Sequence, residues 1–493
     1  MEEEHLDPTT EISLDTVKKR AVKGVAVLTG RTFLLSVLSL VATGFLTVFL
    51  SPVEFGVFWI VSAVVNFLAY FSDVGLAAAL IQKREKLTNA DLKTTFTVQT
   101  ILVILILAIL LSVSPLIVSH YSLSVGGKYL LFALAISLFL SSLKTIPSIL
   151  MERDLEFGKL VIPQVLENLV YNLVAVILAW KGFGITSFTI AVLARGVVGL
   201  VAMYFLKPWK PAISFNKKSF KDLLSFGIPY QANTLLATLK DDGMTVVLGS
   251  VLGPAGIGLL GWAQKWGQAP LRFFMDHVIK VTFPAFSRMQ DEKEHLKRSL
   301  TRSIFFICFL VFPSVVGLLM VAPVIVAIIP RYEKWVPALI PLAFISVNSI
   351  FAAVTTQLTN TLNAIGKIKI TFGLMIMWTV LSWIFIPYMA LKYGVNGAAA
   401  GYSIVGLSSI VAIFVARKFV DFSLMESVLK PLLAAFVMML PLIFLRRALP
   451  ASLGSVWILV ATGAIIYLSV IFALYGLGFI EDVKNTFSAF FKK

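Results

Sequence analysis

The stretch "LGPAGIG", from Leu252 to Gly258, occurs twice in the chain in closely similar form. The earlier copy is "LSPVEFG", from Leu50 to Gly56, and the two prolines, Pro52 and Pro254, lie 202 residues apart. Each copy opens a long apolar segment. A repeat at this spacing indicates that one helical bundle is present in two copies.

Two weaker matches extend the repeat. "EFGKLVI", which contains Gly158, matches "AIGKIKI", which contains Gly366, at an offset of 208 residues. "GFGITSFTIA", which contains Gly184, matches "KYGVNGAAAG", which contains Gly394, at an offset of 210 residues. An even number of predicted helices, six, separates the copies, so both copies have the same orientation. The sequence therefore predicts parallel repeats related by an axis along the membrane normal.

The composition indicates a membrane protein. Of the 493 residues, 58% are hydrophobic and 14% are charged, with a mean hydropathy of +0.91; soluble proteins carry about 25% charged residues. Apolar runs such as 97–118 are long enough as helices to cross a hydrocarbon core of about 30 Å. The short alternating segments of a transmembrane β-barrel do not fit these runs. We expect an all-α polytopic membrane protein with about fourteen transmembrane helices. The expected helices are roughly 25–50, 53–80, 92–118, 128–147, 160–180, 184–206, 220–250, 254–283, 302–328, 335–362, 368–391, 395–416, 428–447 and 455–478.

The repeat divides these helices into two six-helix lobes. An N-terminal tail, 1–24, precedes the first lobe, which spans 25–206 and contains helices 1 to 6. A linker, 207–219, leads to the second lobe, 220–417, with helices 7 to 12. The remaining residues, 418–493, hold two further helices and a tail.

The net charge of +16 is unevenly distributed. Assigning alternate loops to opposite sides gives 29 basic residues on the side of the N-terminus and 7 on the other. The positive-inside rule then places both termini in the cytoplasm, with the protein in the cytoplasmic membrane. The excess is thus a topology signal, and we expect no nucleic-acid partner. The acidic start, "MEEEHLDPTT", is unlike a secretory signal, and the single Cys308 excludes an intrachain disulfide.

Five segments together resemble a known family. They are "LSPVEFGVFWIVSAVVNFLAYFSDVGLAAALIQ" (50–82), "VLGSVLGPAGIGLLGWAQKWGQAPLRF" (247–273), "FPAFSRMQDEKEHLKRS" (283–299), "KWVPALIPLAF" (334–344) and the following "NAIGKIK". With them the chain resembles the Wzx-type polysaccharide flippases of the multidrug/oligosaccharidyl-lipid/polysaccharide exporter superfamily, over nearly its whole length. One departure is the cluster Lys240, Asp241 and Asp242, where the family pattern has an isolated Asp or Asn before "VLGSVLG".

The resemblance implies a membrane transporter and not an enzyme. Such flippases move an oligosaccharide on a polyprenyl diphosphate, such as undecaprenyl diphosphate, to the outer leaflet by alternating access between two lobes. This step serves lipopolysaccharide or exopolysaccharide synthesis, with membrane lipids and, as candidate partners, a polysaccharide polymerase and glycosyltransferases. We expect no cofactor, with proton or sodium coupling as a candidate. A lipid II flippase or a multidrug exporter of the same superfamily is the alternative.

An enzyme acting on lipid-linked sugars is a further alternative, from a different class. Such an enzyme needs a sizeable loop or domain outside the membrane, with carboxylates or histidines gathered in it. The longest predicted loops have about 15 to 20 residues, and the four histidines form no cluster in the sequence. The sequence favours a transporter, and it predicts no catalytic residue and no metal ligand.

Charged residues inside the predicted helices are the candidate site. Each costs about 2.5 to 3.5 kcal/mol at a helix centre, so we expect these side chains to face a wet cavity or one another. Helical spacing arranges many of them in polar stripes, which, with Arg31 of helix 1, are predicted to line a cavity between the lobes. The stripes are Lys265, Gln268, Arg272 and Asp276 on helix 8, Ser62, Asn66, Tyr70 and Asp73 on helix 2, and Asn233 with Lys240 on helix 7.

A buried diphosphate needs fixed cations, because apolar walls do not solvate phosphate oxygens. The predicted substrate-binding residues are Arg31, Lys240, Lys265, Arg272, Asn66, Asn233 and Gln268. The alternative for the cations is structural pairing or snorkelling to the interface. Buried carboxylates are candidates for ion coupling, and the alternative is that they neutralise the cations or, for Glu167, complete a helix contact. These carboxylates are Asp73, Glu167, Asp241, Asp242 and Asp276.

Overall fold

The computed structural model describes residues 14–476. Within this range the side chains of 14–26, 29, 232–234 and 277 lie outside the description. Throughout 14–476 the chain forms helices joined by short turns, with no strand. This confirms the expected all-α class. The chain divides into two compact units, unit 1 (Met1–Gly258) and unit 2 (Leu259–Lys493), and the border falls inside one helix.

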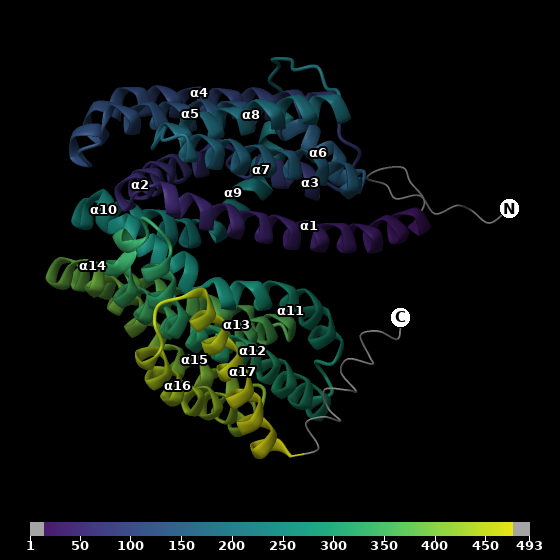
Figure 1. Ribbon diagram of the computed structural model, residues 1–493. Coiled ribbons are helices and arrows are strands. Elements are labelled where there is room, and N and C mark those ends of the chain that lie inside the picture. The colour runs from purple at the N-terminus through teal and green to yellow at the C-terminus, as the bar shows by residue number, and fades with distance from the viewer. Residues whose placement is uncertain (1–13, 477–493) are drawn as a thin grey trace. The chain divides into compact units, whose positions relative to one another are not determined.

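Unit 1 contains the helices of the first repeat and the start of the second. Its α4, α5 and α8 lie side by side, and α7 packs against α8 and α1 (Figure 1). The elements are α1 (Leu14–Phe49), α2 (Pro52–Ala69), the 3-10 turn η1 (Tyr70–Ser72), α3 (Leu76–Gln82), α4 (Asn89–His120), α5 (Val125–Leu143), α6 (Thr145–Arg153), α7 (Phe157–Trp180), α8 (Thr186–Leu206), α9 (Lys217–Thr238), the π-helical turn η2 (Leu239–Gly243) and the first part of α10 (Met244–Gly267).

Unit 2 is built around α12, which contacts α11, α13, α16 and α17. Fully buried apolar side chains recur at helical spacing along one face of α12, from Ile304 to Val315, and form the centre of its core. After the second part of α10, the elements are α11 (Ala269–Arg288), α12 (Lys293–Ile328), the 3-10 turn η3 (Glu333–Ala338), α13 (Leu339–Ala364), α14 (Ile368–Leu407), α15 (Ser409–Arg417), the π-helical turn η4 (Met425–Leu429), α16 (Lys430–Ala448) and α17 (Leu453–Tyr475).

Twelve segments of the described chain are long and apolar enough to span a membrane. The sequence predicted about fourteen. One of the twelve, Ile368–Arg417, contains a break at Gly394 and corresponds to two of the predicted helices. Another, Leu235–Gly267, covers the end of the predicted helix 220–250 and the start of the predicted helix 254–283. The protein is a multi-pass membrane protein, and fourteen is an approximate count.

The repeated motif forms a helix crossing inside unit 1. A Cβ atom on Gly56 would overlap the carbonyl oxygen of Pro254, and a Cβ atom on Gly258 would overlap that of Pro52. The glycine of each copy therefore packs on the proline of the other copy, so that α2 and α10 approach backbone to backbone. Only glycine permits this approach, which explains why both copies contain it.

The other matches locate equivalent turns in the two repeats. Gly184 and Gly394 both have positive φ, 56° and 61°, and both come shortly before a helical segment. The turn before α7 has its positive φ at Leu155, and the turn before α14 has it at Gly366, 211 residues later. The match between "EFGKLVI" and "AIGKIKI", at an offset of 208, is therefore about one helical turn out of structural register.

The predicted helix 53–80 is interrupted, which corrects the stripe expected along it. The helix ends in the 3-10 turn Tyr70–Ser72, and Val74 and Gly75 have φ values of 50° and 75°. Two consecutive residues with positive φ cannot continue an α-helix, so α3 begins anew at Leu76. Asp73 consequently lies in the break and not on the helical face that carries Asn66.

The compact units and the predicted lobes divide the chain at different places. Unit 1 includes α9 because α9 packs against α3 and α4. The packing is close, since a Cβ atom on Gly75 would overlap the backbone of Gly227. The lobe borders at the linker 207–219 describe the repeat and remain a prediction.

Candidate functional site

A buried ion-pair cluster joins three helices of unit 1. The Nζ atom of Lys144, at the end of α5, donates to Oε1 of Glu167 on α7. The Nε atom of Arg195 on α8 lies 3.7 Å from Oε2 of the same carboxylate. The side chain of Glu167 is only 11% exposed, whereas that of Arg195 is 53% exposed. The carboxylate thus lies inside the bundle, and about half of the Arg195 side chain remains exposed.

Local structure explains how the cluster fits inside the bundle. Lys144 is the residue between α5 and α6, and its Nζ atom reaches Glu167 on α7. On α8, a Cβ atom at Gly199 would overlap the carboxylate of Glu167. The glycine therefore leaves the space that the carboxylate occupies. The sequence prediction named Glu167, and it missed Lys144.

Arg31 extends this cluster along α7. Its Nη1 atom donates to Oε1 of Gln164, which lies one helical turn before Glu167. Structural pairing was an alternative predicted for Arg31, and the structure shows the uncharged Gln164 as a partner. The unit 1 cluster, which we define as Arg31, Lys144, Gln164, Glu167 and Arg195, contains three cations and one carboxylate.

The stripe predicted on helix 2 packs beside the charged turn of helix 7 in unit 1. Asn66 of α2 lies near Asp242, and α2 contacts the turn that contains Asp242. Asp242 lies in the π-helical turn Leu239–Gly243, which includes the whole cluster of three charges. π-helical turns within helices occur often at functional sites. Lys240 lies 3.6 Å from Asp241, whose side chain is 73% exposed. The side chain of Asn233 lies outside the described part.

Asp73 has a structural role in this arrangement. Its two carboxylate oxygens accept from the backbone N–H of Ala77, at 3.1 and 3.2 Å. The carboxylate thereby caps the first turn of α3 after the break. The hydroxyl of Tyr70, which belongs to the same predicted stripe, donates to the carbonyl of Gln231 on α9. Both groups hold the broken helix in place.

Unit 2 carries the stripe predicted on helix 8. The helix bends at Gln268, before Pro270, but the backbone N–H of Arg272 still donates to the Gln268 carbonyl at 3.0 Å. Lys265, Arg272 and Asp276 are exposed, and the guanidinium of Arg272 lies 3.4 Å from Oε1 of Gln268. The stripe thus continues across the bend. A cavity shared with unit 1 stays a prediction.

The opposite face of α11 is anchored in unit 2. Met275 and Phe286 are buried there, and Asn360 of α13 donates to Thr282 Oγ1 at 3.0 Å. Gln357, which is fully buried, lies beside the same threonine. A rigid, neutral contact therefore holds α11 so that its charged stripe faces outward from the unit.

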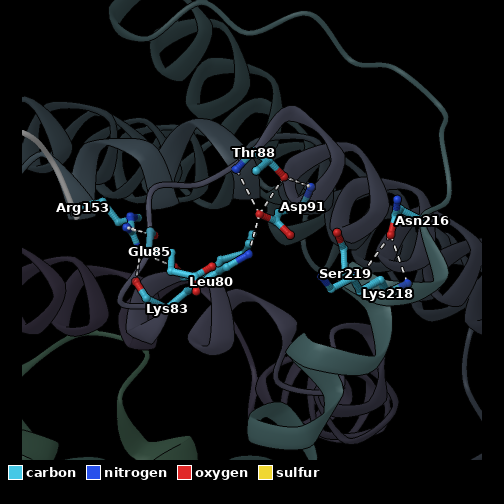
Figure 2. Close-up of polar contacts among 9 residues, drawn as sticks. All are labelled: Leu80, Lys83, Glu85, Thr88, Asp91, Arg153, Asn216, Lys218 and Ser219. Carbon is cyan, nitrogen blue, oxygen red and sulfur yellow. Dashed lines mark hydrogen bonds and ion pairs between the residues drawn. The ribbon is translucent and has the colours of Figure 1, made fainter. Parts of the chain in front are cut away.

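A second polar cluster in unit 1 was missed by sequence reasoning. The buried Arg153 donates to the carbonyls of Leu80, Lys83 and Glu85 at 2.7, 2.8 and 3.1 Å (Figure 2). These carbonyls belong to the end of α3 and the following loop, which have no helical partners of their own. Arg153 thus fixes the loop between α3 and α4.

Asp91 fixes the other end of the same loop (Figure 2). It accepts from Lys83 Nζ at 2.7 Å and from the backbone and hydroxyl of Thr88 at 3.0 and 2.8 Å. Thr88 in turn accepts from the Asp91 N–H, which completes a capping box for α4. The pattern Thr88-x-x-Asp91 before an apolar run was a readable signal for this cap.

The fold is that of an all-α, polytopic membrane protein. The structure is similar to that of the lipid II flippase MurJ in an inward closed conformation, with a TM-score of 0.74 and 18% identity, covering 91% of this chain and 98% of that one. The chain belongs to the polysaccharide biosynthesis protein family, whose model matches residues 45–340.

Two relatives place the chain more closely within its family. It is 24% identical over 406 residues to the lipopolysaccharide biosynthesis protein WzxC of Escherichia coli (strain K12), covering 80% of each chain. It is also 24% identical over 270 residues to the succinoglycan biosynthesis transport protein ExoT of Rhizobium meliloti (strain 1021), covering 55% of this chain and 54% of the relative. The second likeness therefore extends over about half of that protein.

Proposed function

We propose that the protein is a flippase for oligosaccharides linked to a polyprenyl diphosphate of the undecaprenyl type. It moves them across the cytoplasmic membrane by alternating access, for the synthesis of a cell-surface polysaccharide. Family membership supports this proposal, since relatives are named for lipopolysaccharide biosynthesis and succinoglycan transport. The fold, similar to that of a lipid II flippase, supports a lipid-linked substrate.

The excess of cations in the unit 1 cluster is the observation that carries the proposal. Lys144 and Glu167 neutralise each other, which leaves Arg31 and Arg195 with positive charge. The membrane interior makes an unneutralised cation costly, so such residues are retained for a function. Two guanidinium groups suit the oxygens of a diphosphate, because each presents a planar fork of donors. In unit 2, Arg272 presents the same guanidinium fork, and Lys265 adds a positive charge.

A multidrug exporter is the less suitable alternative. A cationic drug calls for an acidic and aromatic site, whereas the unit 1 cluster has more cations than carboxylates. A lipid II flippase shares the diphosphate anchor and differs only in the head group of its substrate. A comparison of head groups on one anchor therefore separates the two flippase functions.

The proposed orientation places the basic loops in the cytoplasm. In unit 1 these loops lie together at one end: Lys207 Nζ is 2.6 Å from Asp154 Oδ2, and the Asn216 N–H donates to Thr94 at 3.0 Å. Their proximity supports the alternation of sides on which the positive-inside rule was applied. Both termini are then cytoplasmic. A glycosyltransferase would act on the cytoplasmic side and a polymerase on the outer side.

Asp242 is the carboxylate we propose for ion coupling. Glu167 is held by two cations, and Asp73 caps α3. Asp242 lies near the neutral amide of Asn66, in a turn of irregular helix. A carboxylate in this setting can exchange a proton or sodium ion without breaking an ion pair. Transport by Asp242→Asn should no longer depend on a proton or sodium gradient.

The test is a flipping assay with purified protein in liposomes. A fluorescent oligosaccharide on undecaprenyl diphosphate is the substrate, and its accessibility to an impermeant quencher reports its leaflet. We expect Arg31→Ala, Arg195→Ala and Arg272→Ala each to reduce flipping by about tenfold or more, because a charge-assisted contact is lost. Insertion into the membrane should remain normal.

Two controls make this test decisive. Arg447→Ala removes an exposed cation at the end of α16 and should leave flipping unchanged. Arg31→Lys retains the charge and should retain part of the activity. Full activity in all three alanine variants would refute the cation assignment. Flipping of lipid II at the rate of the oligosaccharide substrate would assign the protein to the lipid II branch.

A further inference from the structure

The segment between α8 and α9 presents two apolar side chains to its surroundings. Ile213 is 83% exposed and Phe215 is 56% exposed. They flank Ser214, and alternate residues of an extended segment point to opposite sides. A pair of large apolar side chains in a loop is costly in water, so this placement calls for a surface that covers them.

Hydrogen bonds fix the backbone of this segment against α4. Thr97 Oγ1 donates to the Ser214 carbonyl and accepts from the Ser214 N–H, both at 2.9 Å. The Asn216 N–H donates to Thr94 Oγ1 at 3.0 Å. Both threonines are buried, and Trp209 packs edge-on against Phe96 with ring centroids 5.1 Å apart. The apolar pair is therefore held outward by the fold.

Exposed lysines surround the apolar pair. Residues 207–221 contain five lysines and no acidic residue. Lys207 is paired with Asp154, and the other four are exposed. The Asn216 side chain accepts from the N–H groups of Lys218 and Ser219 at 3.0 Å each, and so fixes the start of α9 (Figure 2). The four exposed lysines are Lys210, Lys217, Lys218 and Lys221.

We propose that residues 207–221 form an interfacial anchor that binds anionic phospholipid. The lysines contact the head groups, and Ile213 and Phe215 insert between the upper parts of the acyl chains. The segment directly follows the membrane-spanning α8, so chain connectivity places it at the membrane surface. Its uniform positive charge matches an anionic leaflet, which attracts each lysine near the surface. This anchor is independent of the transported substrate.

The test uses the full chain with an environment-sensitive fluorophore at Phe215→Cys. Cys308→Ala provides the background; because Cys308 is fully buried, the variant that retains it serves as a second background if the alanine destabilises the protein. In vesicles containing phosphatidylglycerol we expect emission at shorter wavelength than for a label in water. A spin label near the head group should quench it more strongly than one near the chain end.

The role of charge is tested separately from that of the apolar pair. In vesicles of phosphatidylcholine alone, or at high salt, we expect the emission shift to decrease. Changing Lys217, Lys218 and Lys221 to Gln should decrease it in anionic vesicles too, whereas changing them to Arg should preserve it. Inorganic diphosphate should leave the emission unchanged.

Several results would overturn the proposal. If the label in anionic vesicles emits at the same wavelength as a label in water, the segment does not insert into the membrane. An equal shift in neutral and anionic vesicles would remove the role of the lysines. Reversal by inorganic diphosphate would assign the lysines to a soluble anion or to a substrate head group. A shift that occurs only in native membranes, and not with purified lipid, would point to a protein partner instead.

Discussion

Equivalent positions in the two repeats carry side chains of different charge. The turns at Leu155 and Gly366 are 211 residues apart, and at this offset Lys144 corresponds to Thr355 and Glu167 to Trp378. Thr355 is buried and donates to a carbonyl of its own helix, at 3.1 Å. Trp378 packs against the hydrophobic core of unit 2. An ion pair in unit 1 thus corresponds to neutral side chains in unit 2.

This difference shows that the two repeats share their backbone geometry but not their buried polar side chains. The shared turns and the crossing of the two "P-x-x-x-G" motifs keep the helices in equivalent positions. A buried ion pair contributes little net stability compared with apolar packing, because both ions lose their hydration. Unit 2 forms the equivalent helices without such a pair. We infer that unit 1 retains its pair for transport.

The strongest test of this comparison removes the carboxylate at Glu167. Glu167→Ala leaves Lys144 inside the bundle without its partner, and breaking a buried pair in this way costs about 3 to 5 kcal/mol. We expect a marked loss of stability, measured by thermal and chemical unfolding in detergent, together with a loss of flipping.

A double variant separates stability from transport. Lys144→Met with Glu167→Leu replaces the pair by uncharged side chains, as in unit 2, and should restore stability to within about 1 kcal/mol. Flipping should remain impaired, since the charge arrangement around Arg31 and Arg195 has changed. Wild-type flipping by the double variant would show that the pair is purely structural and that the two units do not differ in the way we infer.

The second test concerns the end of α6, where unit 1 again has a buried charge. Arg153 corresponds to Ala364, a buried residue of unit 2, at the same offset. Arg153→Ala removes the donor that satisfies the carbonyls after α3, and we expect a loss of about 3 kcal/mol in unfolding free energy. Arg153→Lys should lose less, since one ammonium group reaches only some of the carbonyls.

An exposed cation nearby provides the control for Arg153. Lys159 pairs with Glu156 at the surface, and its side chain is 54% exposed. Lys159→Ala should change the unfolding free energy by less than about 1 kcal/mol, as is usual for surface pairs. Equal unfolding free energies for Arg153→Ala and the wild type would show that water satisfies the carbonyls and that Arg153 is dispensable for stability.

Sequence patterns predicted the parts of this molecule that depend on local composition. The long apolar runs identify the helices, and the two copies with Pro52 and Pro254 identify the repeat. The stripe on α11 was predicted because its residues follow one another at helical spacing. Asn66, from the stripe predicted on helix 2, lies beside the turn that contains Asp242, but Asp242 belonged to no predicted stripe.

The parts that could not be predicted depend on tertiary contacts. Lys144 forms an ion pair with Glu167 on another helix. Arg153 donates hydrogen bonds to carbonyls of a loop about 70 residues earlier in the chain. No local pattern encodes such partners. The break after α2 was missed because Val74, a β-branched residue, adopts positive φ, which sequence reasoning assigns to glycine. Asp73 was therefore placed on a helix face that does not exist.

The smallest expected effect comes from the equivalent turns themselves. A side chain in the left-handed region costs roughly 1 to 2 kcal/mol, and glycine avoids this cost. At Gly366 a Cβ atom would meet open space, so Gly366→Leu should lose about 1 kcal/mol for backbone strain alone. Leu155→Gly relieves the same strain but loses packing of a half-buried side chain and adds chain entropy, so its net change should stay within about 0.5 kcal/mol. Thermal unfolding of both variants measures the difference. If Leu155→Gly destabilises more than Gly366→Leu, side-chain packing and not backbone strain governs the turn in unit 1, and the two turns are equivalent in shape only.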